Sequence, residues 1–141
     1  MKIFLFILFL TFPTISIHSQ DSKVYKLSEV TDPPMFYEPS VYNKLYSKKD
    51  AFVKNVYSFI QKNINIITNR TSTQHKAFVE VLIDENGNTT ITNSRGSSKI
   101  AEKEALKAVK KLPKLIPAKL DNKSVKMTFI IPVKFNVYVI N

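Results

Sequence analysis

The chain has no cysteine, no tryptophan, two glycines and two histidines among its 141 residues. Without cysteine it can form neither a disulfide framework nor a thiolate metal site. Beyond the N-terminal segment only His75 remains, which is too few ligands for zinc. Two glycines cannot build a G-x-G-x-x-G or Walker phosphate loop. These absences argue against enzymes that depend on zinc, a cysteine nucleophile or a bound nucleotide.

The acidic residues offer no better candidate for catalysis. Asp84 and Glu85 are adjacent, but they precede Asn86-Gly87, a strong turn dipeptide in which acidic side chains are common. Asp50 and Asp121 are also interpreted as cap and turn residues. We therefore expect a protein that is not an enzyme, with no catalytic residue, no cofactor and no bound metal.

The first 19 residues predict an exported protein. Lys2 is followed by an apolar run from Ile3 to Leu10, and Ser19 is a small residue suited to cleavage. The alternative is a retained membrane anchor, although Pro13 breaks the run well before the ~20 apolar residues that a spanning helix needs. Removal of Lys2 with the signal peptide lowers the formal net charge from +10 to +9. Export without disulfides favours a bacterial periplasm.

Residues 20–48 show no persistent hydrophobic period and contain Pro33-Pro34, which predicts an extended lead-in with a short strand at 23–30. A domain is expected over 49–141. Its first helix, over 51–63, would be capped by Asp50 and would place apolar side chains on one face. The polar residues 65–75 are expected to form a loop.

A hairpin and a second helix follow. Alternating apolar residues over 77–83 predict a strand, Asn86-Gly87 the turn, and 89–93 the return strand. Ser98 is expected to cap a helix that Pro113 ends, because proline cannot donate the next helical hydrogen bond. Pro113, Leu115 and Pro117 then form a stiff elbow before the last strand.

The last strand is long and apolar at every second position from Val125 to Val139. Pro132 lies in its middle, and a proline without an N–H belongs on an edge strand or at a bulge. We therefore expect this strand to lie at the edge of the sheet, with one face in the core. The edge-strand residues on its other face are Lys126, Thr128, Ile130, Pro132, Lys134 and Asn136.

Lysines recur along one side of the second predicted helix and just beyond it. Residues 99–126 contain nine lysines and three acidic residues. The basic stripe consists of Lys99, Lys103, Lys107, Lys110 and Lys114. It could be an ordinary solvated helix face, or it could contact phosphates, lipid headgroups or an acidic partner. A nucleic-acid partner is not expected, because arginine and aromatic residues do not alternate with these lysines.

The order of these features resembles the C-terminal domain of the energy transducer TonB. The features are Ile83-Asp84-Glu85-Asn86-Gly87, Glu104-Ala105-Leu106, the elbow from Pro113 to Ala118 and Pro132-Val133-Lys134-Phe135, within a similarity that spans about residues 23–137. Leu115 stands where the family elbow usually has tryptophan, and Asp121-Asn122 replaces a common Asn-Gly. The resemblance implies a small α+β fold, with an antiparallel sheet made of a hairpin and a long C-terminal edge strand, packed on two helices.

The resemblance also implies a function, because the family domain binds outer-membrane receptors by adding a receptor segment to its sheet edge. We expect a periplasmic module that binds a TonB-dependent receptor or another envelope protein in outer-membrane transport. One alternative is a structural protein whose edge strand pairs with its own copy as a homodimer. Another is a cationic protein that binds anionic glycolipid through the basic stripe.

Overall fold

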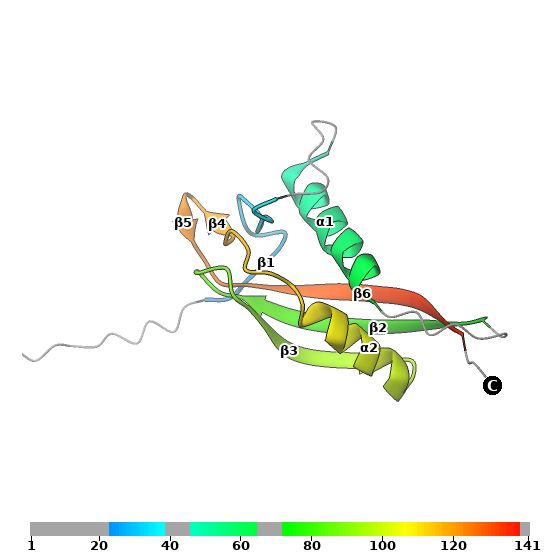
Figure 1. Ribbon diagram of the computed structural model, residues 1–141. Coiled ribbons are helices and arrows are strands. Elements are labelled where there is room, and N and C mark those ends of the chain that lie inside the picture. The colour runs from blue at the N-terminus through cyan, green and yellow to red at the C-terminus, as the bar shows by residue number, and fades with distance from the viewer. Residues whose placement is uncertain (1–22, 39–45, 65–71, 139–141) are drawn as a thin grey trace, which may run out of the picture.

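The computed structural model describes residues 23–38, 46–64 and 72–138, and the predicted signal peptide lies outside these residues. Its elements are β1 (Tyr25–Lys26), α1 (Lys48–Asn63), β2 (Ser72–Ile83), β3 (Thr89–Gly96), α2 (Lys99–Val109), β4 (Lys119–Leu120), β5 (Lys123–Ser124) and β6 (Met127–Tyr138). Figure 1 shows α2 lying along β2 and β3, with α1 beside β6. No helix within the described ranges is long and apolar enough to cross a membrane.

The main sheet has the strand order β1-β6-β2-β3. β6 pairs with β2 in antiparallel register from Met127 to Tyr138, and β2 pairs with β3 in the same sense. β1 adds a parallel pairing over two residues, so the sheet is mixed. The predicted small α+β fold, with a hairpin, a long last strand and two helices, is confirmed.

Two predicted boundaries were wrong. The predicted loop over 65–75 ends earlier, because Ser72 to His75 already pair with β6; residues 65–71 are not among those described. The return strand was predicted to end at Asn93 but continues to Gly96. A bulge between Glu80 and Val81 shifts the register of this hairpin. The sequence pattern missed the extension because the bulge interrupts the regular alternation on which a strand prediction depends.

The hydrophobic core lies between one face of the sheet and the two helices. Odd-numbered residues of β2 and β6 supply the sheet side, as their alternation predicts. α2 contributes alanines, which let the helix lie close to the strands. The fully or nearly buried residues from these elements are Ala77, Val79, Val81, Ile83, Ala101, Ala105, Ala108, Val109, Met127, Ile131, Val133 and Phe135. Neither of the two helices in the described ranges covers the opposite face of the sheet.

α1 packs on this core mainly through Phe52, Val56 and Ile60. The Phe52 ring lies 5.2 Å, centroid to centroid, from the ring of Phe129 on β6. The predicted cap Asp50 was wrong by three residues, since Ser47 is the N-cap and its hydroxyl accepts a hydrogen bond from the Asp50 N–H. Asp50 instead lies in the first turn, where its negative charge suits the helix dipole.

The described part of the lead-in, residues 23–38, pairs with the elbow, and the strand predicted over 23–30 is shorter than expected, since β1 covers only Tyr25–Lys26. Met35 and Ile116 exchange two backbone hydrogen bonds of 3.0 and 2.8 Å, and Asp32 forms a second bridge with Lys119. Pro33 and Pro34 are buried beside these bridges. Pro33 and Pro34, which interrupt the hydrophobic period of the lead-in, are therefore packed in the protein interior.

The elbow is anchored on the hairpin turn between β2 and β3. The Leu115 N–H donates to the Gly87 carbonyl at 2.9 Å, and Gly87 has a φ of 82°. A Cβ on Gly87 would lie 1.7 Å from the Leu115 carbonyl oxygen, so this close approach requires glycine. α2 ends at Val109, four residues before Pro113, and Lys110 is its C-cap. Pro113 therefore follows the helix end and does not itself set it.

Candidate functional site

Among the described residues, no strand pairs with the outer edge of β6 over most of its length. β6 has β2 on one side throughout, whereas on its other side β1 covers only Met127 and Thr128. The Lys126 carbonyl accepts from the Tyr25 N–H, and the Lys134 carbonyl accepts from the Gln61 side chain. Even-numbered residues therefore direct their backbone groups away from β2, because alternate residues of an antiparallel strand face opposite sides.

This geometry explains how a proline fits within a long strand. Pro132 is an even-numbered residue, so an N–H at this position would face away from β2. The absence of that N–H therefore costs no hydrogen bond between β6 and β2. Ile130 and Lys134 flank it with outward N–H groups. Among the described residues, none is bonded to the backbone of Ile130 on this side. Pro132 therefore interrupts the free edge without weakening the sheet.

The open edge has limits at both ends. β1 occupies it up to Thr128, and the Gln61 Nε2 atom of α1 donates to the Lys134 carbonyl at 3.1 Å. Residues 129–133 lie between these two contacts. An added strand would find this segment accessible without displacing any described contact.

An apolar groove runs beside the same segment, between β6 and α1. It has a volume of about 370 Å³ and is lined by Val53, Lys54, Val56, Tyr57, Phe129, Ile131 and Pro132. Tyr57 is 50% exposed and Val53 is 39% exposed, although both are large apolar side chains on a helix. The Lys54 ammonium lies over the ring of Tyr46 at 3.1 Å from its centroid. The groove is therefore walled almost wholly by hydrocarbon surface.

The predicted edge-strand residues fall into two groups. Lys126 and Thr128 are half-buried next to β1, so they are not on the open edge, which corrects that part of the prediction. Ile130, Pro132, Lys134 and Asn136 are exposed, and Ile130 has 53% of its surface accessible. Their side chains lie on the face of the sheet away from the helices. The sequence prediction missed the α1 side chains that form the other wall of the groove.

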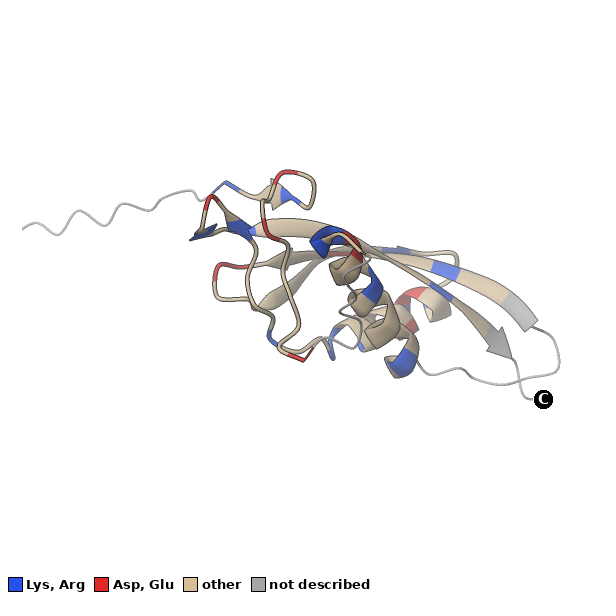
Figure 2. Cartoon of the chain, turned by 90° about the horizontal axis from the view of Figure 1, so that it is seen from above, with Lys and Arg blue, Asp and Glu red and all other residues tan. Residues whose placement is uncertain are grey.

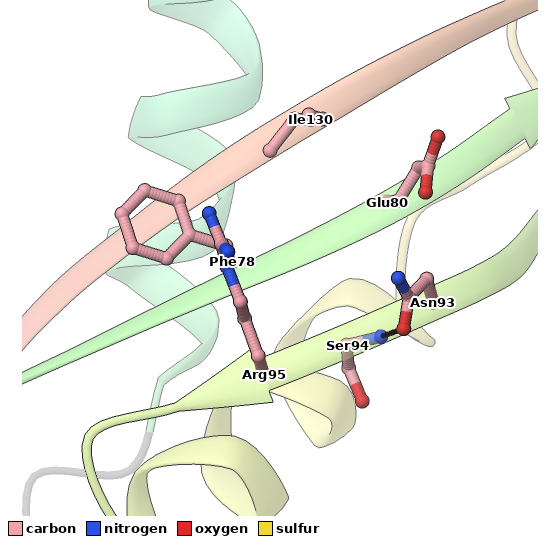
Figure 3. Close-up of a pocket in the computed structure, with 6 residues that line it drawn as sticks. All are labelled: Phe78, Glu80, Asn93, Ser94, Arg95 and Ile130. Carbon is pink, nitrogen blue, oxygen red and sulfur yellow. Dashed lines mark hydrogen bonds between the residues drawn. The ribbon is translucent and has the colours of Figure 1, made fainter.

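A second hollow, of about 230 Å³, lies on the open face of the sheet. Figure 3 shows Phe78, Glu80 and Arg95 above the strands, with both helices behind them. The Arg95 guanidinium lies 5.0 Å from the centroid of the Phe78 ring. Glu80 accepts a hydrogen bond from the Thr128 hydroxyl at 3.2 Å. These groups are engaged with neighbouring side chains.

The elbow residues have structural positions. Leu115 is 1% exposed and packs within the core. Pro113 is exposed and Pro117 is half-buried, on either side of the bridge between Ile116 and Met35. Leu115 is thus an interior packing residue with almost no surface to offer a partner.

The basic stripe is exposed throughout. Lys99, Lys103 and Lys107 lie on α2, whereas Lys110 and Lys114 follow its end. Lys107 is 2.7 Å from the buried carboxylate of Glu104, so part of its charge is compensated. Figure 2 shows basic residues also on α1, on the strands and around the short β4–β5 hairpin. The positive charge is therefore spread over the molecule and is not concentrated on α2.

Of the two adjacent acidic residues at the hairpin turn, Asp84 has a structural role. Its side chain accepts hydrogen bonds from the Asn86 and Asn88 N–H groups at 2.9 and 2.8 Å. Partial burial acts to raise the pKa of Asp84, but the hydrogen bonds from Asn88 and Asn86 and the charge of Lys114 outweigh it and lower the pKa. Asp84 therefore shapes the turn that receives the elbow.

His75 lies against the start of α2. His75, predicted in a polar loop, lies on β2, where its Nδ1 atom is 3.2 Å from the Ser98 hydroxyl and its ring stacks on Phe135. Ser98 is the N-cap of α2, as predicted. Across the part of the chain that the structure describes, no three His, Cys, Asp or Glu side chains are grouped to hold a metal ion.

The free edge of β6, the β2–β3 hairpin and the elbow all lie within a segment that matches a known protein family. Residues 68–137 match the family described as Gram-negative bacterial TonB protein C-terminal. The chain belongs to the TonB C-terminal domain family. Searches of curated proteins and of solved structures found no match.

The matched segment runs from just before β2 to the end of β6. A TonB C-terminal domain is a non-enzymatic protein-interaction module of the Gram-negative envelope. The lead-in and α1 precede the match, although both pack on the TonB C-terminal core. The predicted domain limits at residues 49 and 141 remain a prediction.

Proposed function

We propose that this protein is an exported periplasmic module that binds an envelope protein by strand addition to the outer edge of β6. The partner class is a TonB-dependent outer-membrane receptor or another component of outer-membrane transport. The observation that carries the proposal is the unpaired backbone of β6 between β1 and Gln61, in a chain of the TonB C-terminal family. Backbone pairing of this kind provides affinity with few demands on the partner's sequence.

The charge of the molecule supports a partner of opposite sign. The chain has a formal net charge of +10, and exposed lysines flank the edge at Lys54 and Lys134. Such a surface accelerates encounter with an acidic segment, and added salt weakens this steering. The same charge opposes the alternative in which two copies of the chain pair edge to edge.

A pull-down from source-cell envelope tests the proposal. The chain, produced from its full 141-residue sequence and immobilised by a linker, is incubated with detergent-solubilised envelope. Retained proteins are identified by mass spectrometry. We expect outer-membrane receptors to be retained by the native chain and lost with Ile130→Pro, which removes an outward N–H. Ile130→Thr is the matched control, because it changes the same exposed side chain and keeps the backbone donor.

Self-association is the second candidate, because the same free edge could pair with a copy of itself. Sedimentation of the purified chain at increasing concentration separates the two readings. A dimer that Ile130→Pro abolishes, together with no retained receptor, would contradict receptor binding. Retention of glycolipid that is lost in high salt, and is indifferent to Ile130→Pro, would favour the basic stripe.

A further inference from the structure

The groove between α1 and β6 lies beside the open edge of β6. We propose that it selects an extended peptide segment with apolar side chains at every second position, which enter the groove while the peptide backbone pairs with β6. This inference rests on the proposed strand addition and adds the chemical class of the bound segment. It depends on α1, which precedes the segment that matches the TonB C-terminal family.

The first argument is the position of the groove. Phe129 and Ile131 line it from β6, and their neighbours Ile130 and Pro132 direct backbone groups to the open edge. A strand added there would continue the sheet by one spacing of about 4.8 Å and lie beneath α1. Since side chains alternate across a sheet, every second residue of the added strand would point toward Val53 and Tyr57.

The second argument is the cost of leaving the groove open. Val53 and Tyr57 are 39% and 50% exposed, and Phe129 is half-buried beneath them. Large apolar side chains gathered around one groove, rimmed by a charged residue such as Lys54, mark an interaction surface. Apolar side chains from a partner would remove this surface from water. Polar side chains there would lose hydrogen bonds to water without finding a partner.

The third argument is the existing occupant of the same edge. β1 pairs with β6 at Met127 and Thr128, and its Tyr25 side chain packs against the core from the added position. The chain then leaves the edge, and the Lys26 N–H bonds to the Glu29 carboxylate at 2.7 Å in the following turn. A partner strand would occupy the same position beside β6 as β1, further along the edge. A second copy of this chain is disfavoured as occupant by the shared charge of +10.

Two synthetic nonapeptides of identical composition provide the test. In Glu-Thr-Val-Thr-Val-Thr-Val-Thr-Glu the three valines share one face of an extended chain. In Glu-Thr-Thr-Val-Val-Val-Thr-Thr-Glu they do not. Binding to the isotope-labelled chain is measured from the amide NMR signals of Ile130 and Lys134. We expect the alternating peptide to bind roughly tenfold more tightly, the effect of one well-buried apolar anchor.

Groove variants complete the test. Tyr57→Ser and Val53→Ser should each remove most of this preference, and both residues are exposed enough for the fold to persist, which thermal unfolding checks. Phe78→Ser is the matched control on the open face and should leave the preference unchanged. Equal binding of both peptides at β6, unaffected by the groove variants, would overturn the selection and leave strand addition standing. No shift at Ile130 and Lys134 with either peptide would overturn strand addition and the selection with it.

Discussion

The β3 edge of the sheet and the outer edge of β6 differ in length, polarity and regularity. β3 is an eight-residue strand of mostly polar residues, joined to β2 through a bulge and followed directly by α2. β6 is twelve residues long, alternates in hydrophobicity and has an apolar groove beside its open edge. Short, polar and bulged edges discourage pairing with another chain, whereas long apolar edges invite it. The β3 edge therefore has features that discourage pairing, whereas the β6 edge has features that favour it.

Protection on the β6 side depends on few groups. Pro132 removes one outward donor, Gln61 occupies one outward carbonyl, and Lys134 adds a charge. Each of these limits pairing at a single position. Few residues therefore limit pairing along the β6 edge, and a single substitution is expected to strengthen or weaken that pairing.

The largest expected effect comes from adding a proline at a position of β6 whose N–H faces β2. Ile131→Pro should lower the free energy of unfolding by ~3 kcal/mol or more, because Ile131 is 2% exposed and its N–H faces β2. Ile130→Pro, one residue away, should cost less than ~1 kcal/mol because its N–H faces the open edge. Urea unfolding followed by circular dichroism measures both. Similar losses of unfolding free energy for the two variants would contradict the assignment that odd-numbered residues of β6 bond to β2 and even-numbered residues face the open edge.

The elbow variant tests the protected side of the sheet. Leu115→Ala should lower the free energy of unfolding by ~2–4 kcal/mol, since the side chain is 1% exposed within the core. Leu115→Met is the control, because it conserves volume and should cost less than ~1.5 kcal/mol. A loss below 1 kcal/mol for alanine would mean that the elbow packs loosely on the β2–β3 turn. Chemical denaturation of each variant provides the measurement.

Restoring the missing donor should sharpen the contrast between the edges. Pro132→Thr supplies an outward N–H at the middle of the free segment, and one added hydrogen bond is worth ~1 kcal/mol, or about a fivefold gain in affinity. We expect tighter binding of the alternating nonapeptide in the NMR titration. Sedimentation should also show more self-association than in the native chain. If neither quantity changes, Pro132 is not what limits pairing at this edge.

The smallest expected effect is a dependence of stability on acidity. The hydrogen bonds that lower the pKa of Asp84 stabilise the fold fully above its usual value of 3.8, and this contribution is lost as the pH falls through the lowered pKa. Because the group is largely hydrated, the contribution should be a few tenths of a kcal/mol. Asp84→Asn keeps an acceptor but cannot titrate. Its urea midpoint should therefore fall less than that of the native chain between pH 6 and pH 3.

Local signals in the sequence determined most of the central architecture. The alternation over residues 77–83 and along the last strand predicted β2 and β6, Asn86-Gly87 predicted the hairpin turn between β2 and β3, and Ser98 marked the start of α2. Pro132 predicted an edge position, and at that residue β6 pairs with β2 on one side while no described strand pairs with its outer side. These signals depend only on backbone conformation and on which side chains share a face, so they can be read from neighbouring residues.

Tertiary structure alone decided what surrounds the edge. No local pattern indicates that β1 covers Thr128, that Gln61 reaches the Lys134 carbonyl, or that Val53 and Tyr57 stand beside β6. Segments more than 70 residues apart in the chain meet at these contacts, as from Gln61 to Lys134. Their packing depends on the shape of the whole core. The sequence therefore determined that the last strand has an edge to offer, and only the fold decided how much of it is open and which side chains stand beside it.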